Sequence, residues 1–342
     1  MQSLVIDDIG HTAFRDTDAV APGPGEVLLD VAFVGLCGSD LNTFLGLNPL
    51  VELPRIPGHE IGGTVAARGP DVDPEFAVGQ GAIVIPYTTC GTCLSCRKGR
   101  VNACQFNKTL GVQQDGGLRT QIVLKTDRLI PNDSLSLKHM ALVEPLSVGF
   151  HAVSRGSVSA ADTVLVLGGG MIGVGAILGA KARGAKVIVS EVADSKIDTL
   201  RALKVDGVVN PMTDSLSEAV SALTQGAGPD VVIEAVGLGE TFRAAVDLAP
   251  FSGRVVYVGY AKSEVSYDTK FFNLKELDIF GSRNATLSDF KEVIAYLETH
   301  PSIADRLITK VIPWTEADQA LAHWVSHRDA VFKIMIDMKD AQ

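Results

Sequence analysis

The sequence predicts an α/β fold, with a doubly wound parallel sheet in the second half of the chain and another compact unit before it. Three observations support this. The chain has 342 residues, more than one domain usually has. From residue 162 onward, short apolar runs alternate with amphipathic stretches, as in a sheet whose strands and helices alternate. The first of these runs leads into a glycine-rich turn and an apolar helix.

The glycine-rich turn has the pattern of a dinucleotide-binding site. Gly168, Gly170 and Gly173 are spaced G-x-G-x2-G between a strand at 163–167 and a helix. The first two glycines let the backbone approach a pyrophosphate, and the third lets helix and strand pack closely. Glycines alone often mark only a flexible loop. The strand before, the helix after and an acidic residue about twenty positions later make the pattern specific.

The acidic residue is Glu191, at the end of the next strand, 186–191. A carboxylate there can accept hydrogen bonds from ribose hydroxyls and repel a 2′-phosphate, so NAD is favoured over NADP. The alternative is an ordinary exposed carboxylate after a strand. Four further strands are predicted, at 207–210, 229–237, 254–260 and 277–282. Six strands make a complete two-half Rossmann unit.

Four of the five cysteines lie within residues 88–105, as Cys90, Cys93, Cys96 and Cys104. Their spacing, C-x2-C-x2-C-x7-C, lets a loop wrap a tetrahedral ion, and zinc is the expected occupant. Four thiolates leave no position for substrate, so this zinc would be structural. Two disulfides are the alternative, disfavoured by a reducing cytosol and by the short spacing. An iron–sulfur cluster is a further alternative, without any nearby sign of electron transfer.

A second, open metal site is predicted from residues that lie apart in the sequence. Cys37 occurs in "GLCGSD", His59 and Glu60 occur in "PGHEIGG", and Glu144 occurs in "VEPLSVG". A thiolate, an imidazole and carboxylates can bind zinc and leave a position for water or substrate, as catalysis requires. The alternative for Cys37 is a small buried apolar residue.

These motifs together resemble those of the medium-chain alcohol dehydrogenases. Residues 58–72 read G-H-E-x2-G-x5-G-x2-V, which is similar to the zinc signature of that family, and the other motifs follow in the family's order along the whole chain. Glu60 and "EPLSVG" resemble the sorbitol, threonine and sugar-acid dehydrogenases more than the ethanol-type enzymes, which have a cysteine where Glu144 stands.

The resemblance implies a domain organisation. Residues 1–147 would form a mainly β, GroES-like catalytic domain with the structural zinc lobe at 88–105. Residues 148–282 would form the NAD-binding Rossmann domain, and 283–342 would return to the catalytic domain.

The resemblance also implies roles for site residues. Cys37 and His59 would bind the catalytic zinc, with Glu60 and Glu144 as a third ligand and a neighbour; which glutamate binds at rest stays open. Ser39 would accept the substrate's proton, although a hydroxyl in such a loop can also simply stabilise a turn. Relatives often have a histidine where this chain has Asn42, and an amide has no useful pKa for a proton relay.

Further cofactor contacts follow from the resemblance alone. Ile172 would lie against the cofactor, Lys196 near the adenosine ribose, and Val258, Gly259 and Tyr260 beside the nicotinamide. For Lys196 the alternative is a solvated charge on a helix.

Charge and composition restrict the partners. The formal net charge of −10, from 40 acidic and 30 basic residues, argues against nucleic acid or an anionic membrane as the main partner. The N-terminal stretch has no basic run, long apolar core or cleavage site, so we expect a cytoplasmic protein. We expect a small-molecule alcohol as substrate, two zinc ions per chain, NAD as cofactor, and a homodimer or homotetramer.

The predicted function is the NAD-linked oxidation of a secondary alcohol to a ketone, on a sugar acid or polyol similar to L-galactonate, L-idonate or sorbitol. Arg283 and Asn284 lie at the return from the cofactor domain, where this fold has the mouth of its cleft. A guanidinium can bind a carboxylate through two hydrogen bonds and an amide can bind a sugar hydroxyl. For Arg283 the alternative is an interdomain ion pair or a cofactor contact. Two other functions stay open: a threonine 3-dehydrogenase and a sensor that binds a dinucleotide without catalysis.

Overall fold

The structure is a computed structural model, and it describes residues 1–341. The chain divides into two compact units, Met1–Glu144 with Ile294–Gln342, and Pro145–Val293. The division falls inside two helices, α4 (Val143–Arg155) and α10 (Leu287–Thr299). No helix of the described residues has both the length and the apolar character that crossing a bilayer requires.

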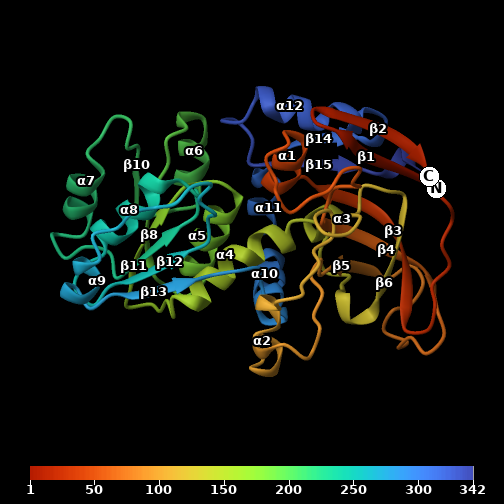
Figure 1. Cartoon of the computed structure of the whole chain (residues 1–342), viewed down its shortest axis with the longest axis horizontal. Coiled ribbons are helices and arrows are strands. Elements are labelled where there is room, and N and C mark those ends of the chain that lie inside the picture. The colour runs from red at the N-terminus through yellow and green to blue at the C-terminus, as the bar shows by residue number, and fades with distance from the viewer. Residues whose placement is uncertain (342) are drawn as a thin grey trace. The chain divides into compact units, whose positions relative to one another are not determined.

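The second unit contains a six-stranded parallel sheet of order β10-β9-β8-β11-β12-β13. Its strands are β8 (Thr163–Leu167), β9 (Lys186–Ser190), β10 (Gly207–Val209), β11 (Val231–Glu234), β12 (Arg254–Tyr257) and β13 (Asp278–Gly281). Its other helices are α5 (Met171–Ala182), α6 (Asp194–Ala202), α7 (Leu216–Leu223), α8 (Gly239–Leu248) and α9 (Lys270–Leu274). They surround the sheet in Figure 1.

The strand order confirms the predicted doubly wound sheet. The chain runs outward from β8 to β10 on one side and then restarts at β11 on the other side of β8, so the order reverses between β8 and β11. Ligands of such sheets bind outside the carboxyl ends of the strands at this reversal. Val164 to Leu167 and Val231 to Glu234 are all buried, because helices cover both faces of a parallel sheet.

The first unit is mainly β, also as predicted. A hairpin of β1 (Gln2–Asp8) and β2 (His11–Asp16) accompanies a seven-stranded sheet of order β14-β15-β3-β4-β5-β7, in which β6 also pairs with β3. The strands of this sheet are β3 (Glu26–Gly35), β4 (Glu60–Arg68), β5 (Gly81–Val84), β6 (Gln121–Lys125), β7 (Leu129–Pro131), β14 (Ile308–Pro313) and β15 (Lys333–Asp337). Only β14 and β15 pair in parallel.

Short helices complete the first unit. They are α1 (Gly38–Phe44), α2 (Leu94–Arg97), α3 (Leu137–Met140), α11 (Pro301–Leu307) and α12 (Ala320–Ser326), with 3₁₀ turns at Val101–Ala103, Thr126–Arg128, Trp314–Gln319 and Lys339–Ala341. The C-terminal segment belongs to this unit because β15 pairs antiparallel with the end of β3, with Met335 opposite Gly35. This pairing brings the beginning of β15 close to Leu36 and Cys37.

Candidate metal and cofactor sites

The loop that carries Cys37 is fixed by a buried carboxylate. Cys37 is the N-cap of α1, and Asp40, in the first turn of that helix, is only 1% exposed. Asp40 accepts hydrogen bonds from the backbone N–H of Cys37, at 2.9 Å, and of Gly58, at 3.0 Å. One side chain therefore ties the loop before α1 to the residue before His59.

Three side chains of the predicted open site come together. One ligand atom each from Cys37, His59 and Glu60 lies within 4.8 Å of the others. His59 Nδ1 and Glu60 Oε2 are buried and have no hydrogen-bond partner among the described residues. A sulfur, a nitrogen and a carboxylate oxygen are ligands that zinc accepts, and three of them leave a position open. The residues present therefore fit a zinc ion.

The charges around this group favour a cation. Burial is the largest single effect and lowers the pKa of His59. The combined effects of Cys37, Asp40 and Glu144 outweigh it, so the pKa rises well above its usual value. Three acidic groups thus surround the imidazole, and a metal ion would balance their charge.

Glu60 has a buried ion-pair partner that the sequence does not reveal. Lys333 Nζ, at the beginning of β15, donates to Glu60 Oε1 at 2.5 Å and to the carbonyl oxygen of Leu36 at 2.9 Å. Lys333 is 2% exposed and Glu60 is fully buried. Burial raises the pKa of Glu60 even though Lys333 opposes this effect. Glu60 therefore offers a metal its second oxygen while its first oxygen is held by an ammonium group.

Glu144 lies near the open site but has a different partner. It stands in the first turn of α4, and its Oε1 accepts a hydrogen bond from the phenol of Tyr87. Both side chains are buried. Burial and the Glu144 carboxylate raise the pKa of Tyr87 well above its usual value, so its hydroxyl remains a donor. Among the described residues, Glu144 does not belong to the group of Cys37, His59 and Glu60.

Ser39 lies in the first turn of α1, two residues after Cys37. Its Oγ is buried and has no hydrogen-bond partner in residues 1–341. Its backbone carbonyl accepts from Thr43 Oγ1 at 2.9 Å. A buried hydroxyl without a partner is costly, which is consistent with a ligand that completes its hydrogen bonding. Its role in proton transfer remains a prediction.

The four remaining cysteines form a compact second group. The Sγ atoms of Cys90, Cys93, Cys96 and Cys104 all lie within 4.8 Å of one another, and none forms a disulfide. The hydroxyl of Ser95, with backbone N–H groups, lowers the pKa of Cys93 to about 5. Four thiol groups at this separation, one of them readily ionised, fit a tetrahedral zinc ion with no open position.

The glycine-rich turn has the geometry of a nucleotide-binding turn. Gly168 has a φ of 97°, which favours glycine, and a Cβ on Gly173 would lie 1.8 Å from the carbonyl oxygen of Gly168. Around Gly170, the N-cap of α5, there is open space. The turn can therefore accept a phosphate at the N-terminus of α5 without steric conflict.

Glu191 is not the ordinary exposed carboxylate that was the alternative, because it is only 8% exposed. Its Oε2 accepts from the backbone N–H of Gly169 at 2.7 Å, and its Oε1 accepts from that of Ala193 at 2.9 Å. The carboxylate thus fixes the glycine-rich turn. Each of its oxygens has a second lone pair for a further donor.

The other predicted cofactor residues lie on neighbouring elements of the second unit. Ile172 is in the first turn of α5 and Lys196 is in α6. Val258, Gly259 and Tyr260 follow β12. A Cβ on Gly259 would lie 2.5 Å from the backbone nitrogen of Gly237, so the segments after β11 and β12 need glycine to approach so closely. Tyr260 is 77% exposed.

The predicted substrate residues follow β13. Arg283 and Asn284 come directly after Ser282, and Asn284 has a φ of 53°, a left-handed conformation that asparagine tolerates better than most residues. Neither belongs to the unit that holds the open metal group.

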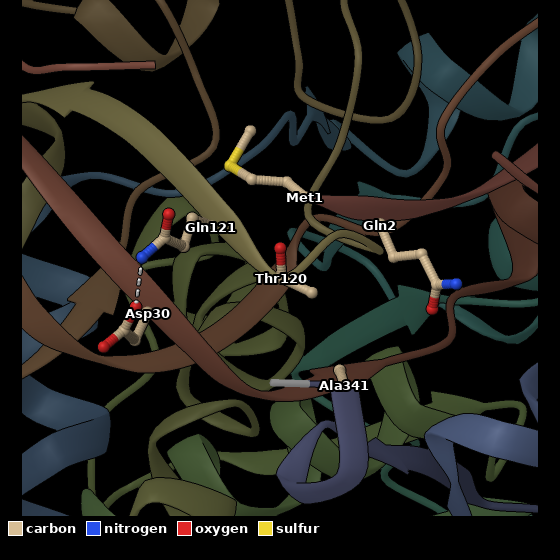
Figure 2. Close-up of a pocket in the computed structure, with 6 residues that line it drawn as sticks. All are labelled: Met1, Gln2, Asp30, Thr120, Gln121 and Ala341. Atoms are coloured by element: carbon tan, nitrogen blue, oxygen red, sulfur yellow. Dashed lines mark hydrogen bonds between the residues drawn. The ribbon is translucent and has the colours of Figure 1, made fainter. Parts of the chain in front are cut away.

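A cavity of about 380 Å³ lies elsewhere in the first unit, lined by Met1, Gln2, Asp30, Thr120, Gln121 and Ala341. Figure 2 shows its polar side chains, among which Gln121 donates to Asp30 at 2.7 Å. It contains none of the residues that the sequence predicts for a site, so it carries no functional assignment.

Comparisons with known proteins identify the family of the chain. An alcohol dehydrogenase GroES-like domain family matches residues 23–134, and a zinc-binding dehydrogenase family matches residues 172–299. The L-galactonate-5-dehydrogenase of Escherichia coli K12 is 31% identical over 92% of each chain. The sorbitol dehydrogenase of Halalkalibacterium halodurans is 30% identical over 94% of each chain.

A solved structure extends the likeness to the whole fold. It is a crystal structure of an alcohol dehydrogenase, RspB, from Escherichia coli CFT073, complexed with NADH. It has a TM-score of 0.90 and 27% identity over 98% of this chain and 99% of the other. The chain therefore belongs to the zinc-type medium-chain alcohol dehydrogenase family and is an NAD-dependent oxidoreductase that contains zinc.

Proposed function

We propose that this dehydrogenase, which is of the sugar-acid or polyol type, oxidises a secondary alcohol of an aldonate similar to L-galactonate or L-idonate, with a polyol such as sorbitol as a poorer substrate. The observation that carries this proposal is the group of Cys37, His59 and Glu60 with Glu144 nearby. It has the mixed ligand set and the extra carboxylate of the sorbitol and sugar-acid enzymes that the sequence resembles.

In the proposed mechanism, Cys37, His59 and Glu60 would hold the catalytic zinc, which would supply a positive charge to stabilise negative charge on the reacting oxygen. Lys333 keeps one oxygen of Glu60 occupied, so the other oxygen would be left for the metal. Asp40 fixes the two segments that carry Cys37 and His59. Ser39 would relay the hydroxyl proton of the substrate, accepting it while passing its own hydroxyl proton outward, toward ribose hydroxyls and solvent. Its Oγ is buried without a hydrogen-bond partner among the described residues, so it is available for this contact. NAD, when bound, would supply the acceptor for the hydride of the substrate.

The proposed domain roles follow from this assignment. Residues 1–147 and 283–342 serve catalysis, and residues 148–282 bind NAD. Cys90, Cys93, Cys96 and Cys104 bind the structural zinc. We further propose a cytoplasmic homodimer or homotetramer.

A substrate screen tests the function directly. Purified protein with NAD should form NADH with L-galactonate or L-idonate and more slowly with sorbitol. Preference for L-threonine would favour the threonine 3-dehydrogenase alternative. No NADH formation with any polyol, sugar acid or amino alcohol would favour the sensor.

Cofactor choice should depend on Glu191. In the Glu191→Ala variant we expect the KM for NAD to rise about tenfold, as one charge-assisted hydrogen bond to ribose is worth about 1.5–3 kcal/mol. NADP should be accepted better, because the repelling charge is gone. The measurement is the ratio of kcat/KM for the two cofactors.

The matched control is Glu191→Gln. It removes the charge but keeps one acceptor oxygen, which can serve only one of the backbone N–H groups of Gly169 and Ala193. It should therefore relax the exclusion of NADP and loosen the turn less than Glu191→Ala does. An unchanged cofactor ratio in both variants would disprove the role of Glu191.

Substrate choice should depend on Arg283. Arg283→Lys keeps the positive charge but loses the planar guanidinium that binds a carboxylate through two hydrogen bonds. We expect kcat/KM for an aldonate to fall about tenfold or more, while that for neutral sorbitol changes little. Equal losses on both substrates, or a weaker affinity for NAD alone, would instead assign Arg283 a structural or cofactor role.

A further inference from the structure

Tyr87 lies near the open metal site, and its hydroxyl donates a hydrogen bond to one of the predicted metal ligands. It lies three residues before Cys90 and is 8% exposed. Its hydroxyl donates to Oε1 of Glu144 across 57 residues of sequence. Neither its position next to the four-cysteine lobe nor its residue type predicts this contact.

The two glutamates near the site are held in different ways. Glu60 Oε1 accepts from the ammonium group of Lys333, and Glu60 Oε2 is buried without a partner among the described residues. Glu144 Oε1 accepts from a phenol. Glu60 belongs to the group with Cys37 and His59, whereas Glu144 does not in the described chain.

We propose that Tyr87 is a positioning residue, which holds Glu144 beside the metal site and outside the set of resting ligands, so that Glu60 is the third ligand. This inference rests on the metal site proposed above. It answers which of the two glutamates binds at rest.

The physical reason is a competition for the carboxylate of Glu144. A rotation of Glu144 that moved its Oε1 away from the phenol would leave the buried hydroxyl of Tyr87 without this acceptor. An unpaired polar group in a buried position is costly. Without the hydroxyl, the carboxylate of Glu144 would lose this restraint and would more readily fill the position that water or substrate needs. Mutating a side chain that hydrogen-bonds to a group around a metal typically changes the metal affinity or the activity of the protein by about 10–100-fold.

The test uses cobalt as the probe in the full-length protein, because its visible absorption reports the ligands without any turnover. The four-cysteine group would also bind cobalt and absorb in the same region. The spectrum of the open site is therefore obtained by subtracting the spectrum of the same protein with the added Cys37→Ser substitution. Tyr87→Phe removes one hydroxyl and keeps the ring. Tyr267→Phe is the matched control, since it removes a hydroxyl that donates to Tyr257 at 3.1 Å in the other unit.

The expected result is a changed difference spectrum in Tyr87→Phe and an unchanged one in Tyr267→Phe, with similar Tm values for both. The kcat/KM of Tyr87→Phe should fall about tenfold or more. In a Glu144→Ala background, Tyr87→Phe should have no further effect on the spectrum, because Tyr87 acts through Glu144.

Two results would overturn the inference alone. One is an unchanged difference spectrum in Tyr87→Phe. The other is a Tyr87→Phe substitution that changes the spectrum equally in the unaltered protein and in the Glu144→Ala background. A third result, no difference at all between the unaltered protein and its Cys37→Ser variant, would overturn the proposed metal site and the role of Tyr87 with it.

Discussion

The Cys37→Ser variant should fold, lose one of its two zinc ions and lose catalytic efficiency by about a thousandfold or more. Cys37 supplies the only sulfur ligand of the open group in the described chain. A serine hydroxyl is a much poorer zinc ligand at neutral pH. A metal that stabilises an alkoxide contributes several kcal/mol to the transition state, and each 1.36 kcal/mol is a factor of ten in rate.

The measurements are zinc content, kcat/KM and thermal unfolding. Cys93→Ser is the matched control, because it also exchanges one thiol of a zinc group but acts on the closed site. That variant should lose zinc together with stability, since metal binding at a structural site is part of the folding free energy. A Cys37→Ser protein that keeps both zinc ions and full activity would refute the catalytic assignment.

The fold was largely predictable because its signals are local. Alternating apolar runs and the turn at Gly168 to Gly173 depend on residues a few positions apart, and the structure has the six parallel strands that they indicate. The two positions where the chain passes from one unit to the other have no local sequence signal. They fall within α4 and α10, and a continuous helix shows no change of composition at a domain boundary.

Residues of the site could be predicted only where they lie in a short recognisable motif. Cys37, His59 and Glu60 occur in short motifs, and the structure brings them together. The residues that hold them were missed. Asp40 stands in "GLCGSD" and was available as a signal, since a carboxylate near an N-terminus often caps a helix. Tyr87 has no spacing relation to Glu144, and Lys333 is 273 residues from Glu60, so only the pairing of β15 with β3 reveals its role.

Lys333→Met should lower the free energy of unfolding of the zinc-free protein by about 3–5 kcal/mol, the usual result of removing one partner from a buried ion pair. Methionine fills a similar volume, so packing changes little. The Glu60 carboxylate, fully buried, would lose its counter-ion, and the carbonyl oxygen of Leu36 would lose a donor. With zinc bound the loss should be smaller, because the ion near Glu60 Oε2 replaces part of the missing positive charge.

Urea unfolding of each protein, with zinc and after chelation, measures these differences. Comparing the variants within each metal condition removes the effect of chelation on the four-cysteine site. The decisive control is Lys333→Met combined with Glu60→Gln, which removes both charges and should recover most of the lost stability, since replacing both members of a buried pair is often close to neutral. If the single and double variants unfold at the same urea concentration, the buried charge of Glu60 is not the cause. If zinc fails to reduce the loss in Lys333→Met, Glu60 does not contribute a ligand to the open site, and the third position would have to be assigned to Glu144 instead.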